Sequence, residues 1–173
     1  MKLIVAATGA SGVGLTMRLI DALPDSIDTY LISSENADLV REKEERMTSF
    51  RDEQIAAPIA SGSFGADAML ILPCSMNTLA KIAVGIGDNL TTRAAAVMLK
   101  ERKRLILAPR EMPYSAIALE NMLKLSQLGV VIAPPVLGYY SHPKNLEEME
   151  NFLIGKWFDL LGIEHALYRR WEG

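Results

Sequence analysis

The stretch from Met69 to Glu111 decides the fold, because it contains two apolar strand patterns that each end in polar residues. The first is Met69-Leu-Ile-Leu72, followed by the turn Pro73-Cys-Ser-Met-Asn-Thr78. The second is Leu105-Ile-Leu-Ala108, followed by Pro109-Arg-Glu111. In open α/β sheets, ligands bind beyond the carboxyl ends of the strands. We therefore expect both polar strand ends to face one crevice.

Further strand and helix patterns alternate on both sides of this stretch. Lys2-Leu-Ile-Val-Ala-Ala7 is apolar at almost every position, as in a parallel strand that is buried on both faces. We predict a single Rossmann/flavodoxin-like α/β domain over residues 1–173, with a mainly parallel sheet flanked by helices. The other expected strands are Thr29–Ile32 and Val130–Ala133, and the expected helices cover 15–23, 36–46, 113–129 and 146–161.

The helix pattern over 113–129 carries a dense set of apolar residues. We expect these residues to lie mostly in the core and Gly129 to end the helix. They are Ile117, Leu119, Met122, Leu123 and Leu125.

Composition excludes some classes of protein. Half of the 173 residues are hydrophobic and the net charge is −3, which gives no support to general nucleic-acid binding. The single cysteine, Cys74, cannot form an internal disulfide and is typical of a reducing cytoplasm. No signal-peptide pattern is seen, and no apolar run approaches the roughly 20 residues of a membrane span. We expect a cytoplasmic protein without a membrane or nucleic-acid partner.

A glycine-rich turn, Thr8-Gly-Ala-Ser-Gly-Val-Gly14, follows the first strand. Backbone N–H groups in such a turn can approach a phosphate at a helix N-terminus. Ser11 stands where a dinucleotide fingerprint has its second glycine, and no acidic residue ends the second strand, so NAD is not favoured. From these residues alone, an anion site and a tight structural turn are equally good interpretations.

Three motifs together carry a resemblance to a known family. They are the turn Pro73-Cys-Ser-x-x-Thr-Leu79, the helix Arg93-Ala-Ala...Leu-Lys-Glu101 and the strand end Pro109-Arg-Glu-x-Pro113. The chain resembles the flavin prenyltransferases, within the wider set of FMN-binding flavoproteins that includes cysteine decarboxylases. The resemblance implies that reduced FMN and dimethylallyl phosphate react, through N5 and C6 of the flavin, to give prenylated FMN.

The resemblance also implies partners. The product would pass to a prenyl-FMN-dependent aromatic acid decarboxylase, with ubiquinone biosynthesis as one possible pathway. Members of the family assemble as homododecamers, in which subunits share active sites.

The resemblance assigns a role to individual residues. Glu111, with Ser11, is the expected acid/base pair. The substrate phosphate would be bound by Arg93, Lys100, Tyr140 and Lys156. The residues expected to bind FMN are Gly9, Ala10, Ser11, Ser34, Ser75, Met76, Asn77, Thr78 and Arg110.

Structural interpretations compete with several of these roles. Ser75 or Asn77 can cap a helix without binding a ligand. Arg93 and Lys100 are two helical turns apart on one face, where charged residues are usually solvated. Lys156 occupies a position where the family usually has arginine, and lysine lacks the bidentate fork of arginine. From the residues alone, Tyr140 could equally pack at a loop edge.

Other chemistry is weakly supported. No histidine lies near Cys74 in sequence to activate it, so a buried inert thiol is the expectation. His142 has no second ligand at metal spacing, and we predict no metal. Aromatic residues in the tail, Tyr168 and Trp171, would indicate an intersubunit contact if exposed.

Two alternative functions remain from the sequence. One is an FMN-dependent cysteine decarboxylase, because Pro73–Thr78 resembles the Pro-Ala-Ser-Ala-Asn-Thr motif of that group. The expected catalytic histidine after the first helix is missing, however. The other is a non-catalytic subunit that carries FMN to a separate decarboxylase.

Overall fold

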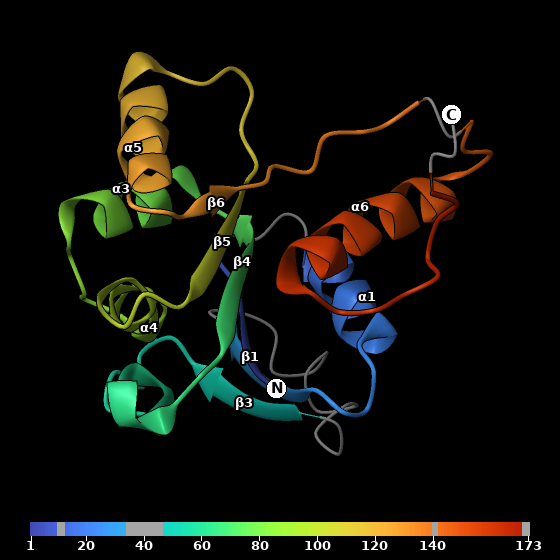
Figure 1. Ribbon diagram of the computed structural model, residues 1–173. Helices are drawn as coiled ribbons and strands as arrows, with labels where there is room; N and C mark the ends of the chain where they lie inside the picture. The colour runs from blue at the N-terminus through green and yellow to red at the C-terminus, as the bar shows by residue number, and fades with distance from the viewer. Residues whose placement is uncertain (10–12, 34–46, 140–141, 171–173) are drawn as a thin grey trace. The chain divides into compact units, whose positions relative to one another are not determined.

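The computed structural model describes all residues except 10–12, 34–46, 140–141 and 171–173 (Figure 1). Contacts divide the chain into two compact units, Met1–Pro134 and Pro135–Gly173. Each unit is described by itself below. The expectation that residues 1–173 form one domain stays a prediction.

A six-stranded sheet forms the first unit, in the order β3-β2-β1-β4-β5-β6. All of its neighbouring strands pair in parallel, so the predicted α/β fold is confirmed. The chain builds outward from β1 in one direction through β2 and β3, and in the other through β4, β5 and β6. The strands are β1 (Lys2–Ala7), β2 (Asp28–Ser33), β3 (Met47–Arg51), β4 (Ala68–Cys74), β5 (Arg104–Pro109) and β6 (Val131–Ile132).

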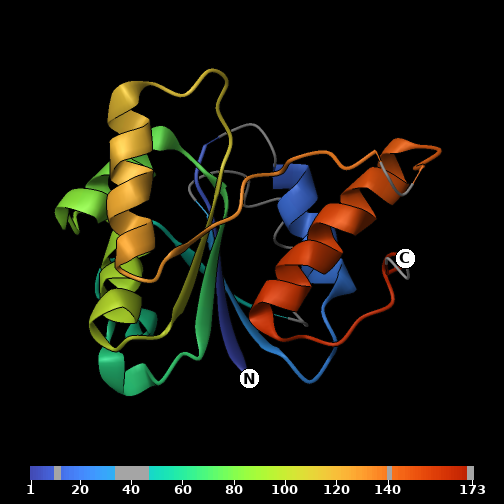
Figure 2. The ribbon, with the colours of Figure 1, turned by 45° about the horizontal axis from the view of Figure 1, so that its top comes forward.

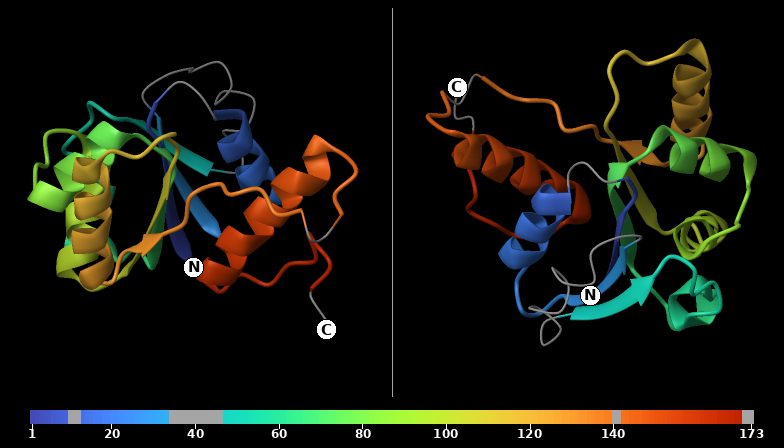
Figure 3. Two further views of the ribbon diagram at one scale, coloured as in Figure 1. Left: turned by 90° about the horizontal axis from the view of Figure 1, so that it is seen from above. Right: turned by 180° about the vertical axis from the view of Figure 1, so that it is seen from behind.

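Helices cover both faces of this sheet, which explains why its central strands are apolar throughout. Figures 2 and 3 show α1 on one face and α3, α4 and α5 on the other. Every residue of β4 is buried, as expected for a parallel strand covered on both sides. The helices of this unit are α1 (Val13–Ala22), α3 (Met76–Val84), α4 (Leu90–Lys100) and α5 (Ala116–Gln127).

The edge strand β3 was missed by the sequence patterns. It pairs with β2 over Thr29–Ser33 and alternates buried and exposed positions only partly, which gives a weak signal. The helix expected over 36–46 lies outside the described residues. The small-residue stretch between β3 and β4 forms two short 3₁₀ turns, η1 (Pro58–Ala60) and η2 (Gly62–Phe64).

Helix α5 forms as predicted, but the expected burial of its apolar residues is wrong. Ile117, Leu119 and Leu123 are 71%, 52% and 61% exposed. Leu125, by contrast, is fully buried and belongs to the hydrophobic core. The periodicity marked an apolar face correctly, but the described part of this chain covers only one side of the helix. Gly129, at φ +87°, follows the last turn, as predicted for a helix end.

The second unit consists of α6 (Leu146–Leu161) and the segment that follows it. Helix α6 has the predicted bounds: the side chain of Asn145 accepts the Glu148 N–H at its start, and Gly162 at φ +74° ends it. Tyr168 is half-buried, whereas the expected intersubunit contact required an exposed aromatic side chain. Among the described helices of both units, none has the length and apolar character needed to cross a membrane.

Candidate functional site

The carboxyl ends of β1 and β4 meet where the strand order reverses direction. These two strands are neighbours, but the chain leaves β1 toward β2 and leaves β4 toward β5. A crevice at such a switch point is the usual ligand site of open α/β sheets. The first polar residues after β1 and β4 belong to the turns at Thr8 and Ser75. These residues therefore lie where a ligand is expected to bind.

Thr8 fastens the two turns together. Its N–H and its hydroxyl both donate to the carbonyl oxygen of Pro73, at 3.0 and 3.1 Å. The same hydroxyl accepts the N–H of Ser75 at 2.9 Å. Because Thr8 is buried, these bonds hold the start of α3 against the end of β1 without competition from water. The sequence reasoning did not single out Thr8. Its place directly after a buried strand was the available signal.

Gly9 follows with φ at +97°, in the left-handed region. A Cβ built there would be 3.8 Å from the Cβ of Ser75, which is ordinary contact. The backbone conformation, and not lack of space, is therefore what requires glycine. Such a turn presents backbone N–H groups toward the crevice, as a bound phosphate needs. Ala10 and Ser11 lie outside the described residues.

Ser75 caps α3, as the structural interpretation predicted. Its hydroxyl oxygen accepts the N–H of Thr78 at 3.2 Å, and its proton is donated to the Thr78 hydroxyl at 3.0 Å. The first N–H groups of the helix, on Met76 and Asn77, have no acceptor within the helix. They lie at the positive end of the helix dipole, which favours an anion or the polar edge of a flavin. Asn77 is exposed, and Met76 is half-buried.

The end of β5 adds a cation and a carboxylate to the same edge of the sheet. Cys74 of β4 is in register with Pro109 of β5, so Arg110 and Glu111 follow directly beside the Ser75 turn. Both side chains are exposed in the single chain. Glu111 Oε1 accepts the N–H of Met112 at 3.0 Å, within its own turn.

Tyr114 lies under this turn and donates its hydroxyl to the carbonyl of Pro109 at 3.4 Å. Burial, and secondarily the charge of Glu111, raise the pKa of Tyr114. Its hydroxyl is therefore a stable proton donor and a poor base beside Glu111.

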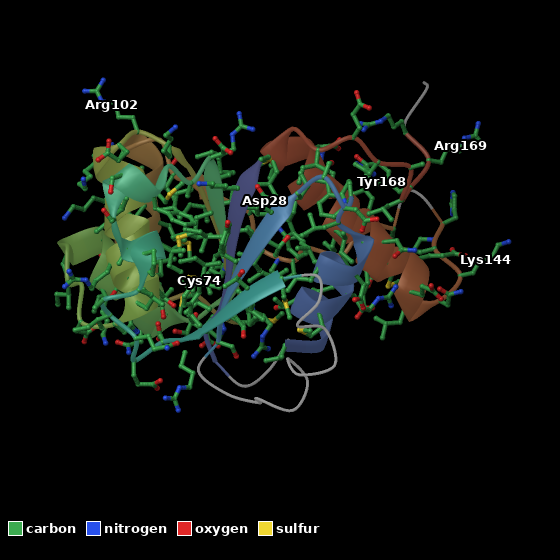
Figure 4. All side chains as sticks on the ribbon, turned by 90° about the horizontal axis from the view of Figure 1, so that it is seen from below. Asp28, Cys74, Arg102, Lys144, Tyr168 and Arg169 are labelled. Carbon is green, nitrogen blue, oxygen red and sulfur yellow. The ribbon has the colours of Figure 1, made fainter. Side chains whose placement is uncertain are left out.

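Cys74 is not a nucleophile. Its side chain is fully buried between the layers of the first unit, and it is labelled in Figure 4. Burial raises the pKa of its thiol to about 12, so it stays protonated at neutral pH. The expectation of an inert thiol is confirmed.

Of the two predicted cations of α4, Lys100 is not at this edge. Helix α4 ends at Lys100, just before β5 begins at Arg104, so Lys100 lies toward the amino ends of the strands. Strand β5 alone is roughly 16–20 Å long at 3.3 Å per residue, and it separates Lys100 from Arg110. Lys100 Nζ pairs instead with Glu101 Oε1 at 2.5 Å. Both Arg93 and Lys100 are exposed.

The remaining predicted residues lie elsewhere. Lys156 belongs to the second unit, where its Nζ lies 3.8 Å from Asp159 Oδ2. Ser34 and Tyr140 lie outside the described residues. Within the first unit, the structure therefore brings together Gly9, Ser75, Met76, Asn77, Thr78, Arg110 and Glu111 at one edge of the sheet.

The donors at this edge fit a flavin mononucleotide by their chemistry. A left-handed glycine turn and a helix N-terminus suit a phosphate or the polar edge of a flavin, and Arg110 can pair with an anion. Among the described residues, no cluster of histidine, cysteine, aspartate and glutamate side chains is arranged to hold a metal.

Comparisons with known proteins agree with this chemistry. The Flavoprotein family model matches residues 1–151. The chain is 48% identical to the flavin prenyltransferase UbiX of Helicobacter pylori, covering 99% of this chain and 98% of that protein. It is 45% identical to the UbiX of Campylobacter jejuni, covering 99% of both.

Solved structures give the same result. AnUbiX (PadA1), in complex with FMN and dimethylallyl pyrophosphate, is 38% identical with a TM-score of 0.91, covering 99% of this chain and 97% of that chain. A dodecameric, FMN-dependent UbiX-like decarboxylase from Escherichia coli O157:H7 is 42% identical with a TM-score of 0.93, over 100% of both chains. The chain therefore belongs to the Flavoprotein family and, within it, to the flavin prenyltransferases of the UbiX type.

Proposed function

We propose that this protein is a flavin prenyltransferase that joins the dimethylallyl group of dimethylallyl phosphate to reduced FMN at N5 and C6. Prenylated FMN and inorganic phosphate are the products. The observation that supports this most strongly is the combination of an end-to-end match to UbiX proteins with the hydrogen-bond donors that gather at the switch point of the sheet. AnUbiX, a solved relative, was crystallised with FMN and a dimethylallyl diphosphate.

The flavin nucleotide binds across the ends of β1 and β4. Gly9 lies at this edge together with the N-terminus of α3 and its residues Ser75, Met76, Asn77 and Thr78, and Ala10 and Ser11 are the further proposed FMN ligands. Arg110 neutralises an anionic group at the same edge through its planar guanidinium. Ser34, which follows β2 in the sequence, is also a proposed FMN ligand. Thr8 holds the two turns in place through its three hydrogen bonds.

Glu111 is the proposed acid/base. Proton removal from the flavin C6 needs a carboxylate within hydrogen-bond reach, and Glu111 is placed beside the crevice by the end of β5. Ser11 is its proposed hydroxyl partner. The Tyr114 hydroxyl, with its raised pKa, does not compete for the proton.

The substrate phosphate needs cations that one copy of the first unit does not bring to this edge. Lys100 projects from the last turn of α4, about a strand length from Arg110, and Arg93 lies on the same helix. We propose that they serve the crevice of a second copy, with Tyr140 and Lys156 as the other phosphate ligands, in a homododecamer. The exposed apolar face of α5, with Ile117, Leu119 and Leu123, fits burial between copies. The E. coli neighbour is a dodecamer.

The wider setting follows from the product. Prenylated FMN has to pass to a decarboxylase that uses it, and supply of ubiquinone precursors is one pathway that fits. We place the protein in the cytoplasm, as a single flavoprotein domain over residues 1–173.

Incubation of the protein with reduced FMN and dimethylallyl phosphate without oxygen tests the function. The expected result is a flavin whose mass has increased by one prenyl group, with one inorganic phosphate released per flavin. An unchanged flavin that stays tightly bound would overturn prenyl transfer and favour a flavin carrier. Carbon dioxide release from a peptidyl or pantothenoyl cysteine would favour the decarboxylase instead.

A further inference from the structure

Asp159 of α6 is a carboxylate shared by four side chains of the second unit. The Tyr168 hydroxyl donates to its Oδ2 at 2.5 Å, and Arg170 Nη2 donates to its Oδ1 at 2.7 Å. His165 Nε2 lies 3.2 Å from Oδ1, and Lys156 Nζ lies 3.8 Å from Oδ2. Arg170 first, and then Tyr168 and His165, hold the pKa of Asp159 well below its usual range. The carboxylate is therefore ionised at any pH at which the enzyme would work.

The segment after α6 brings Arg170 to this carboxylate. Gly155 makes this possible, because a Cβ there would lie 2.5 Å from the Tyr168 ring and 2.6 Å from the His165 ring. The Tyr168 ring packs edge-on against Phe152 at 5.1 Å between centroids. Figure 4 labels Tyr168 on this returning segment. The position of Arg170 is therefore built by packing as well as by its ion pair.

Two cations consequently lie on one carboxylate. Arg170 contacts Oδ1 and Lys156 approaches Oδ2, and their side chains remain 60% and 51% exposed. With one negative charge between them, the group keeps a net positive charge. The contact with Asp159 uses one terminal nitrogen of a guanidinium that carries five N–H donors. Arg170 can therefore hold Asp159 and a second anion at once.

We propose that Arg170 is a second cation of the substrate-phosphate site, acting together with Lys156. This rests on the proposed function, in which Lys156 binds the phosphate of the prenyl donor. Lysine at this position lacks the fork that pairs with two phosphate oxygens. Arg170 supplies that planar fork from the tail and places it on the same carboxylate as the Lys156 ammonium. The competing view is that Arg170 only fastens the tail to α6.

Arg170→Gln and Arg170→Lys test the proposal against this view. We expect Arg170→Gln to raise KM for dimethylallyl phosphate roughly ten-fold or more, which is the loss of one charge-assisted hydrogen bond. KM for FMN should not change. Arg170→Lys keeps the charge but loses the fork, so KM should rise less, but measurably. A tail fastener alone would lower the melting temperature and leave KM for the prenyl donor unchanged.

Lys144→Gln is the matched control. Lys144, which is labelled in Figure 4, is exposed and precedes α6 in the same unit. Asp159 lies in the last turn of α6. The separation along the helix is roughly 20 Å at 1.5 Å per residue. The Lys144→Gln substitution removes the same charge from the second unit as Arg170→Gln, but it should leave both KM values unchanged. An equal rise in KM for Lys144→Gln and Arg170→Gln would overturn the proposal, because net charge alone would then explain it.

A double-mutant cycle with Lys156→Arg sharpens the test. If Arg170 supplies the guanidinium that Lys156 lacks, arginine at position 156 should partly replace it. In the Lys156→Arg background, the fold-rise in KM for dimethylallyl phosphate caused by Arg170→Gln should be less than half of that in the wild-type background. Strict additivity of the two substitutions would contradict a shared phosphate.

Binding of inorganic phosphate separates this inference from the proposed function. Titration calorimetry of the assembled wild-type protein and of Arg170→Gln needs no turnover. Weaker phosphate binding in the variant supports the anion site even if wild-type protein fails to transfer a prenyl group, in which case only the proposed function falls. Equal phosphate binding in the two proteins overturns the role of Arg170.

Discussion

The switch point of the sheet and the cations of α4 are held in opposite ways. At the switch point, buried Thr8 ties together the backbone at Pro73 and Ser75 by three hydrogen bonds within one chain. On α4, Arg93 and Lys100 are exposed, and the Lys100 ammonium pairs with the carboxylate of its sequence neighbour Glu101.

This difference teaches which half of the site one chain prepares by itself. Neutral hydroxyls and backbone groups can be buried when fully hydrogen-bonded, so the contacts between Thr8, Pro73 and Ser75 are complete within one chain. An exposed ion pair contributes little to stability. Lys100 can therefore exchange Glu101 for a phosphate at little cost. We infer that the flavin end is preformed and that the phosphate end is completed on assembly.

Glu111→Gln should produce the largest effect. Removal of a general acid/base typically lowers the rate by about 10²–10⁴-fold, and we expect a loss of that size in kcat. FMN binding should remain, because the crevice itself is unchanged. Glu120→Gln, an exposed carboxylate on α5, is the control. Single-turnover mass spectrometry of the flavin measures the rate, and full activity in Glu111→Gln would remove Glu111 from the mechanism.

Lys100→Gln should act on the other half of the site. We expect KM for dimethylallyl phosphate to rise about ten-fold or more, with FMN affinity unchanged, since one charge-assisted contact to the phosphate is lost. Lys103→Gln removes another exposed charge three residues further on. If the two variants behave alike, Lys100 has no specific role and the assembly argument fails.

Thr8→Val tests whether the flavin end is preformed. The substitution leaves the partly buried N–H of Ser75 without its acceptor, which costs up to about 1–3 kcal/mol. We expect FMN to bind roughly ten-fold more weakly, with KM for the prenyl donor unchanged. Thr8→Ser should restore FMN binding, because it keeps the hydroxyl. Fluorescence titration with FMN well below the melting temperature distinguishes this from a general loss of stability.

Cys74 should give the smallest effect on activity and a specific effect on stability. Its folded pKa of about 12 lies above the unfolded value of about 9. The unfolded chain therefore loses its proton first, and the free energy of unfolding should fall as pH rises from about 9 toward 12. The slope contributed is about 1.4 kcal/mol per pH unit at most. Denaturant unfolding at alkaline pH measures it.

Cys74→Ala should remove this contribution and leave kcat at neutral pH unchanged. A large loss of turnover would mean that the thiol takes part in the reaction.

The sequence predicted best those elements that depend on local pattern. The unbroken apolar run at Met69–Leu72 marked a strand buried on both faces, and β4 is one. Asn145 and Gly162 bracket α6 at the predicted bounds, because capping is a local interaction. The sequence offered Ser75 or Asn77 as a cap for the same reason, and Ser75 caps α3.

Patterns failed where burial depends on distant parts of the chain. Periodicity showed that α5 has an apolar face, but it could not show that Ile117 and Leu123 would remain exposed in one chain. Strand β3 was missed, because an edge strand has a weak alternation and takes its place from pairing with β2.

The sequence by itself determined the family, the parallel α/β class and the residue types that flavin and phosphate chemistry require. The tertiary structure alone decided their grouping. It joined Thr8 to Ser75 across 67 positions, placed Lys100 away from Arg110, and brought Arg170 onto the carboxylate beside Lys156. Strand pairing and chain reversal set such distances through contacts far apart in sequence, which no local pattern encodes.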